Sequence, residues 1–275
     1  MEIQQTPAYA AYIQQLGWHV ATVDHVTIFY KRIPLVGVLV KIQRPTHLPY
    51  LPLLIPFLNS IHATRIAIEP DASLSQELCD VWTRSFLKFY PINLTPFLPT
   101  KTICVDLTPS IEDIFHRYES AKQRAVRRAE KHTIAITISH DVTDIIAIKS
   151  RSAGMFGSIT THGVTELCRS LGQSHFDILL AMHGSTVVGG VLSLYIDTQA
   201  YYWIAGATHK GKQLFAPTLL VHHALLRAKA HGCTSYDFIG VYDERLPKQN
   251  TAWRGFTKFK EGFGGKELYY PLMAR

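Results

Sequence analysis

The residues with the greatest potential for chemistry lie near the C-terminus, in the segment GFTKFKEGFGGKELYYPL, residues 255–272. Lys258 and Lys260 alternate there with phenylalanines, before the pair Gly264 and Gly265. Aromatic side chains between cations suit a groove for a charged, partly apolar ligand, and paired glycines allow backbone to approach that ligand closely. The plain alternative is a core-packed helix with solvated lysines, ended by a glycine cap and followed by a strand.

A second cationic segment is the clearest helix pattern of the chain, residues 108–131. Thr108 can cap this helix, Pro109 fits its first turn, and Glu112 and Asp113 lie where the helix dipole favours anions. One face of the predicted helix carries Arg117, Arg124, Arg128 and Lys131. This face is either a solvated charged surface or a contact for an anionic partner.

Composition limits the class of protein. The 275 residues are 47% hydrophobic with a formal net charge of +7, so we expect one large or two medium folded domains with anionic partners. The four cysteines form no CxxC pair, which favours reduced thiols in a cytoplasmic protein over a disulfide framework or a zinc site. We expect no signal peptide, and the apolar stretch 48–58 is too short to span a bilayer.

The order of predicted elements indicates the fold. From Thr133 onwards we expect a strand, two helices, three antiparallel strands, a helix, a strand, a short helical stretch and a final strand. This is the order of an N-acetyltransferase-like (GNAT) fold, and the first half reads as a shorter, degraded version of the same plan. We therefore predict an α+β protein of two such domains, residues 1–132 and 133–275, each built on a mostly antiparallel mixed sheet. The last strand is expected to be able to return to the first domain.

Known catalytic loops are mostly missing from the sequence. The segment ATHKGKQLFAP, residues 207–217, stands where such folds bind coenzyme A; it keeps Gly211 but has Thr208 and Gln213 at the flanking signature positions. This departure predicts an acyl donor other than a coenzyme A thioester, although the helix start with its lysines could still hold an anion. Asp237 is either catalytic or, more simply, the holder of a turn.

Four blocks of the chain resemble the Fem-type aminoacyltransferases, which transfer amino acids from aminoacyl-tRNA to the stem peptide of peptidoglycan precursors. The blocks, in the order that the family has them, are QTPAYAAYIQQLGW (5–18), TICVDLTPSIEDIFHRYESAKQRAVRRAEKH (102–132), APTLLVHHALLRAKAHGCTSYDFIGV (216–241) and FTKFKEGFGG (256–265). The resemblance implies that Lys260, after Phe259, stands beside the reacting carbonyl, where its ammonium would stabilise the developing oxyanion. These two are the predicted catalytic residues. The predicted substrate-binding residues are Lys41, Arg44, Arg124, Arg127, Arg128, Arg151, Tyr202, Trp203, Asp237, Arg254 and Lys258.

The resemblance further implies aminoacyl-tRNA and a nucleotide-linked or lipid-linked muropeptide as partners. It implies no cofactor and no metal, and a cytoplasmic location at or near the inner face of the membrane. Two alternatives stay open: an acyl-coenzyme A-dependent N-acyltransferase on the same fold, and a catalytically silent protein that binds tRNA or precursor. The family's Arg-x-x-Phe acceptor-binding pattern is not clean here, because Arg151 is displaced and Gly154 or Met155 stands near its place. The identity of the acceptor is therefore open.

Overall fold

The computed structural model describes residues 2–90, 96–153 and 161–273. The chain forms two compact units, one of residues 1–101 with 268–275 and one of residues 102–267. The boundary therefore falls about thirty residues before the predicted one at residue 132. The reason is that β5 (Lys101–Asp106) joins the sheet of the second unit and α5 (Ser120–Lys131) packs into its core, so neither belongs with the N-terminal strands.

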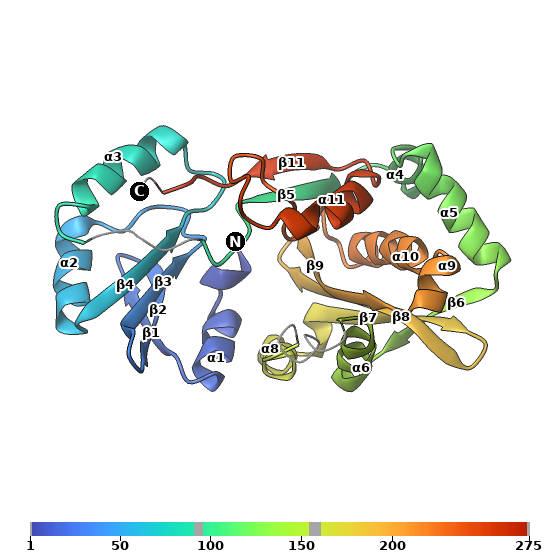
Figure 1. Cartoon of the computed structure of the whole chain (residues 1–275), viewed down its shortest axis with the longest axis horizontal. Coiled ribbons are helices and arrows are strands. Elements are labelled where there is room, and N and C mark those ends of the chain that lie inside the picture. The colour runs from blue at the N-terminus through green and yellow to red at the C-terminus, as the bar shows by residue number, and fades with distance from the viewer. Residues whose placement is uncertain (1, 91–95, 154–160, 274–275) are drawn as a thin grey trace. The chain divides into compact units, whose positions relative to one another are not determined.

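The first unit is built on a four-stranded sheet of order β1-β2-β3-β4 (Figure 1). The first three strands are antiparallel neighbours and the last pair is parallel. The strands span His19–Val23, Val26–Ile33, Gly37–Gln43 and Ala63–Glu69, and the helices of this unit are α1 (Pro7–Gln15), α2 (Leu51–Ser60) and α3 (Gln76–Phe86). Buried Leu54 and Leu58 of α2 and Phe86 of α3 pack on the apolar side chains of the strands.

Helix α2 is an element that the sequence pattern does not predict. Its segment LPLLIPFLNS has no charge and no polar face, and its prolines read as helix breakers. Pro52 lies in the first turn, where the missing N–H costs nothing, and Pro56 stands inside the helix. Burial of Leu54 and Leu58 against the sheet outweighs the local preference.

The second unit is built on a seven-stranded sheet of order β11-β5-β10-β9-β8-β7-β6. Strands β6 to β9 are antiparallel neighbours, and β10 is parallel to β9 and antiparallel to β5. The strands span Ile134–Ser139 (β6), Phe176–His183 (β7), Thr186–Ile196 (β8), Gln199–Ala207 (β9), Ser235–Asp237 (β10) and Lys266–Tyr269 (β11). The helices are α4 (Ile111–His116), α5, α6 (Val142–Ala153), α8 (Val164–Leu171), α9 (His209–Gln213), α10 (Ala216–Ala230) and α11 (Arg254–Glu261).

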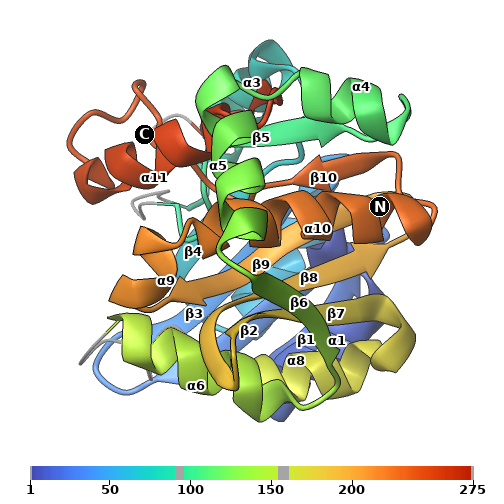
Figure 2. The ribbon, with the colours of Figure 1, turned by 90° about the vertical axis from the view of Figure 1, so that its right-hand side faces the viewer.

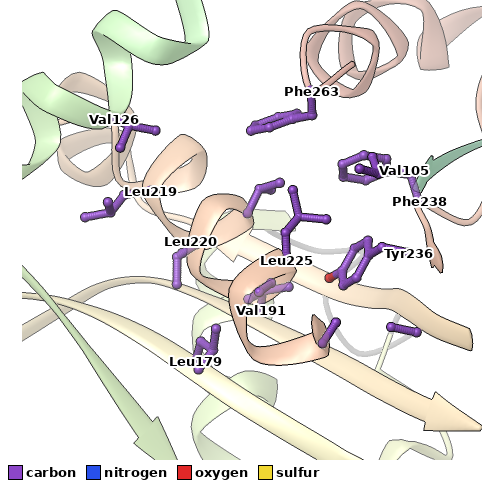
Figure 3. Close-up of a cluster of buried hydrophobic side chains, with 14 of the residues drawn as sticks. Val105, Val126, Leu179, Val191, Leu219, Leu220, Leu225, Tyr236, Phe238 and Phe263 are labelled. Atoms are coloured by element: carbon purple, nitrogen blue, oxygen red, sulfur yellow. The ribbon is translucent and has the colours of Figure 1, made fainter. Parts of the chain in front are cut away.

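Helices cover both faces of this sheet (Figure 2). On one face, α10 lies across the central strands with α5 beside it, and their apolar side chains form the main core (Figure 3). Phe263, which follows α11, reaches the same core and packs against Phe238 with ring centroids 5.7 Å apart. On the other face lies α6, where Ile145 and Ile148 come close to the bare backbone of Gly190. The residues after Lys260 are thus anchored in the core of the second unit.

The helix predicted over residues 108–131 is interrupted in the structure. Helix α4 is capped by Ser110, whose hydroxyl accepts from the backbone N–H of Asp113, rather than by Thr108. The chain bends at Arg117 and restarts at Ser120, and the backbone N–H of Glu119 donates to the carbonyl of Gly262 at 2.9 Å. A contact with the segment after α11, far away in sequence, therefore decides the break.

Strands β9 and β10 separate soon after they meet. Their parallel pairing covers only residues 199–201 and 235–237. Across the β8–β9 pair, Ser193 faces Tyr202 and Leu192 faces Ile204, so Trp203 is the extra residue of a β-bulge, which bends the strand. Beyond this point the edge of β9 is not paired with β10, and the space that opens there holds the candidate site.

Candidate functional site

A pocket of about 250 Å³ lies in the second unit along the free edge of β9. Tyr202 and Phe256 are its aromatic lining residues, while Lys212 and Ser152 bring polar groups from α9 and α6. The other lining residues are small or apolar: Gly190, Ala205, Gly206, Ala207, Pro217 and Leu220. A concave, mostly apolar site with a few polar groups is typical of a binding pocket for a small ligand or for the end of a larger one.

Lys260 is buried beside Tyr202 and Phe256 of this pocket, with 6% of its surface exposed. Its ammonium lies 5.8 Å from the centre of the Tyr202 ring and 5.0 Å from that of Phe256. It donates to the carbonyl oxygens of Phe238 at 2.8 Å, Gly240 at 2.7 Å and Ile239 at 3.3 Å. The lysine thus fixes the turn that follows β10. It also brings a positive charge to the point where β9 and β10 separate.

Burial lowers the pKa of Lys260 to about 8, because an ammonium is less stable away from water. Asp237 acts in the opposite direction and Lys149 in the same one. A lysine of this kind exchanges its proton near neutral pH, which is a common property of lysines in active sites.

Asp237 contacts the turn that follows β10. Its carboxylate accepts from the hydroxyl of Thr102 and from the backbone N–H of Ile239, the latter at 2.6 Å. Ile239 has φ 45° and Gly240 φ 81°, so this turn is in the left-handed region at two successive residues. The carboxylate and the Lys260 ammonium stabilise that conformation from its two sides.

The other predicted residues of this region differ in where they lie relative to the pocket. Tyr202 lines the pocket, and Trp203 occupies the bulge beside it. Arg254 and Lys258 are exposed on α11, where the Arg254 guanidinium donates to the hydroxyl of Tyr242 at 3.0 Å. Phe259 faces away from the Lys260 contacts, because its ring packs against Phe263 and lies 4.0 Å from the ammonium of Lys122.

The predicted cations of α5 lie at the surface of the second unit. The guanidinium of Arg127 lies 5.7 Å from the Phe115 ring, and that of Arg128 lies 5.7 Å from the Phe215 ring. Phe215 directly precedes α10. Together with Arg124, these exposed side chains form a cationic surface on α5.

Arg151 is exposed on α6 and lines a different pocket, of about 310 Å³, with Asp144, Ser185 and Thr186. Gly154 and Met155, near the place of the family's acceptor-binding pattern, lie outside the described residues.

Lys41 and Arg44 lie in the first unit. The Lys41 ammonium stands between the rings of Trp18 and Phe97, at 4.6 and 4.3 Å, and burial lowers its pKa. The Arg44 guanidinium is buried over the Tyr270 ring and donates to the carbonyls of Pro70 and Pro99. These contacts give Arg44 a structural role within its own unit.

Three residues near Lys260 are not among the predicted site residues: Lys149, Ser152 and Phe256. The Lys149 ammonium donates to the carbonyl of Ala205 on β9 at 3.2 Å, and burial lowers its pKa. Phe256 belongs to the aromatic and cationic segment that the sequence does single out. Lys149 and Ser152 carry no sequence signal, since only the packing of α6 on β9 brings them to the pocket.

Among the described residues, no group of His, Cys, Asp and Glu side chains is arranged to bind a metal. None of the helices in the described ranges is long and apolar enough to cross a membrane.

Comparison with solved structures shows which known folds this chain resembles. Over nearly their whole lengths the chain superposes on the crystal structure of FemX (TM-score 0.73, 14% identity, 98% of this chain and 90% of that one). It is also similar to the C-terminal domain of a putative lysylphosphatidylglycerol synthetase from Agrobacterium fabrum (TM-score 0.64, 13% identity, 98% and 87% covered). A GCN5-related N-acetyltransferase from Kribbella flavida gives a TM-score of 0.52 at 11% identity, with 99% and 97% covered. No curated protein matches the chain.

The class is thus an α+β protein of the N-acetyltransferase-like fold, as predicted from the order of elements. Within that class, residues 176–268 match the model of the FemAB family. The resemblance to the Fem-type family is confirmed on this match, which includes β7 to α11 and the pocket residues of β9. The family and the fold together support a transferase of the acyl-transfer class.

Proposed function

We propose that the protein is an aminoacyltransferase that moves an amino acid from aminoacyl-tRNA to an amine of a peptidoglycan precursor. The observation that carries this proposal is the buried ammonium of Lys260 beside two aromatic residues of a mostly apolar pocket. Such a charge is worth more to a developing oxyanion than one in water, because the surroundings are of low dielectric. The FemAB family match over the same residues supports the donor and the acceptor class.

In this mechanism the aminoacyl ester enters the pocket with its carbonyl oxygen towards Lys260. The acceptor amine attacks the ester carbonyl in its neutral form and a C–N bond forms. The C–O bond to the ribose then breaks, and the tRNA leaves with a free ribose hydroxyl, which takes the proton that the amine loses. All three donors of the ammonium are engaged by carbonyls, and the hydrogen bond to Ile239 is the longest at 3.3 Å. The substrate oxygen takes the place of this weakest hydrogen bond.

The α5 cations Arg124, Arg127 and Arg128 are proposed to contact phosphates of the tRNA or the precursor. A helical surface with several exposed cations is suited to a polyanion. The protein would act in the cytoplasm, at the inner membrane face if the acceptor is lipid-linked.

An acyl-coenzyme A donor is the second candidate, and the loop before α10 argues against it. The backbone N–H of Gly211, which would face a pyrophosphate, is taken by the Thr208 hydroxyl at 3.0 Å, and Gly211 is packed onto the carbonyl of Val188. This loop is therefore closed on itself by a helix cap rather than open to an anion.

The deciding experiment is a single-turnover transfer assay with tRNA charged with radiolabelled amino acids and both nucleotide-linked and lipid-linked muropeptides. We expect transfer of label to an acceptor peptide, and no rise of melting temperature with acetyl-coenzyme A. A rise of melting temperature together with transfer of an acetyl group would establish the second candidate. Tight binding of charged tRNA without any transfer would instead indicate a silent binding protein.

A further inference from the structure

Lys149 of α6 is a second lysine bound to the strands that separate here, and its charge is near enough to lower the pKa of Lys260. Its ammonium is bound to β9, through the carbonyl of Ala205, whereas that of Lys260 is bound to the turn after β10. Both lysines are next to lining residues: Ala205 and Ser152 for Lys149, Tyr202 and Phe256 for Lys260. The two ammoniums are therefore held by the two strands that separate at the pocket, Lys149 on β9 and Lys260 on the turn after β10.

The close approach of α6 to β9 is built into the backbone. A side chain at Gly206 would lie 2.7 Å from the Ser152 hydroxyl and 3.0 Å from the Cα of Lys149. Because Gly206 has no side chain, the helix comes near enough for Lys149 to reach the strand. The position of Lys149 is thus set by rigid elements rather than by a surface rotamer.

We propose that Lys149 and Lys260 together form a two-cation site for one anionic oxygen group of the substrate, such as a phosphodiester or a carboxylate. The site deepens the proposed function and rests on it for the identity of the ligand. Lys149 is the half of this site that no family motif marks.

The charges around Lys260 explain why such a pair needs an anion. Burial and Lys149 of α6 both disfavour its ammonium, Asp237 of β10 favours it, and Tyr202 of β9 faces it uncharged, since burial raises the pKa of that phenol. Asp237 is already engaged by Thr102 and Ile239. Two neighbouring cations with one committed carboxylate leave a site that an incoming anion stabilises.

The first test measures the pair directly and needs no substrate. The ¹³Cε resonance of Lys260, assigned by its loss in Lys260→Arg, is titrated in the wild type, Lys149→Met and Lys149→Arg. We expect the titration point to rise by about half a pH unit or more in Lys149→Met, because a repelling charge is removed, and to stay in place in Lys149→Arg. The exposed Lys248→Met is the control for net charge. An unmoved Lys260 titration in a folded Lys149→Met protein would overturn the pair.

The second test identifies the source of the anion. Affinities of uncharged tRNA and of a nucleotide-linked muropeptide are measured for the wild type and Lys149→Met. We expect affinity to fall about tenfold for one ligand, tRNA if the group is a phosphodiester of the donor, the muropeptide if it belongs to the acceptor. Unchanged affinity for both would overturn the anion site, whereas a wild type that binds neither would count against the proposed function and leave the titration result standing.

Discussion

Lys260 is the residue on which the proposed chemistry depends, and its three hydrogen bonds to carbonyls give it a structural part as well. A substitution will therefore change both stability and turnover, and the two effects have to be measured separately. The pH dependence of stability separates the charge of the lysine from its hydrogen bonds.

The folded-state pKa of Lys260, about 8, lies below its ordinary value of 10.5, so folding disfavours the ammonium. The penalty is complete below pH 8 and disappears as the pH rises towards 10.5, because the unfolded chain then binds more protons than the folded one. We predict that, between pH 7 and 10, the free energy of unfolding of the wild type rises relative to that of Lys260→Met, by up to about 3 kcal/mol. Urea unfolding at several pH values measures this difference, and parallel pH profiles would contradict it.

Turnover gives the second prediction for this residue. If the Lys260 ammonium stabilises the developing oxyanion, Lys260→Ala lowers the rate of transfer by about a hundredfold or more even when charged tRNA is saturating. Lys258→Ala, in which an exposed side chain of the same helix is removed, should matter much less to turnover. Single-turnover rates at saturating charged tRNA, on variants shown to be folded, make the comparison. Equal rates for wild type and Lys260→Ala would remove the residue from the mechanism.

Among the elements, the glycines around α11 provide a matched pair. Gly264 has φ 75°, and a side chain there would lie 2.4 Å from the carbonyl oxygen of Arg117, whereas Gly255 is in α11 with open space around it. We predict that Gly264→Ala destabilises the protein by more than about 2 kcal/mol, through strain and a backbone clash. Gly255→Ala should instead stabilise it by about 0.5–1 kcal/mol. Urea unfolding of both variants tests this, and equal effects would show that the turn adapts.

A partly buried ion pair connects α10 to the sheet. Asp177 of β7 accepts from Arg227 at 2.8 Å and from the Tyr195 hydroxyl at 2.9 Å, with His231 at 3.1 Å. Burial opposes ionisation of Asp177, but these hydrogen bonds outweigh it and lower its pKa. The stability gained is therefore present at neutral pH and is lost as the pH falls through the lowered value.

We predict that Asp177→Asn costs about 2 kcal/mol of stability at pH 7, less than for a fully buried pair because Arg227 is 38% exposed. The difference from wild type should shrink in acid. Chemical unfolding at pH 7 and at about pH 2.5, well below the usual aspartate pKa of about 3.9, provides the measurement. Arg227→Met serves as the partner in a double-mutant cycle. If the unfolding free energies of the wild type and Asp177→Asn differ by the same amount at both pH values, the effect comes from packing.

The sequence predicts elements well where local pattern and tertiary structure agree. From Thr133 onwards the helices and strands follow the predicted order, apart from the short α9, because caps, turns and alternation all indicate them. Helix α2 and the break between α4 and α5 have no such local signal, since burial decides the first and the Glu119–Gly262 hydrogen bond the second. For the site, the segment around Lys260 is visible as a motif. Lys149 is not, because its nearness to β9 exists only after folding.

For the whole molecule, the division into two units differs from the prediction for a related reason. The restart of the pattern at Thr133 predicts a domain boundary, but β5 and α5 complete the second unit's sheet and core. The cationic helix α5 thereby belongs to the same unit as Lys260. A surface for a polyanion and a pocket for its reacting end on one unit fit a substrate as large as a tRNA.

The last prediction tests this arrangement on the complete protein. Reversing two exposed charges of α5, in Arg124→Glu/Arg128→Glu, should weaken tRNA binding and reduce the slope of log affinity against log salt by about two, one for each cation that no longer pairs with a phosphate. The matched control is Arg65→Glu/Arg84→Glu, which makes the same change of net charge at exposed positions of the first unit. If binding depends on overall charge alone, both double variants will bind tRNA equally weakly, and α5 is then a solvated face. Weaker binding confined to the α5 variant, with its melting temperature unchanged, assigns the tRNA phosphates to this helix.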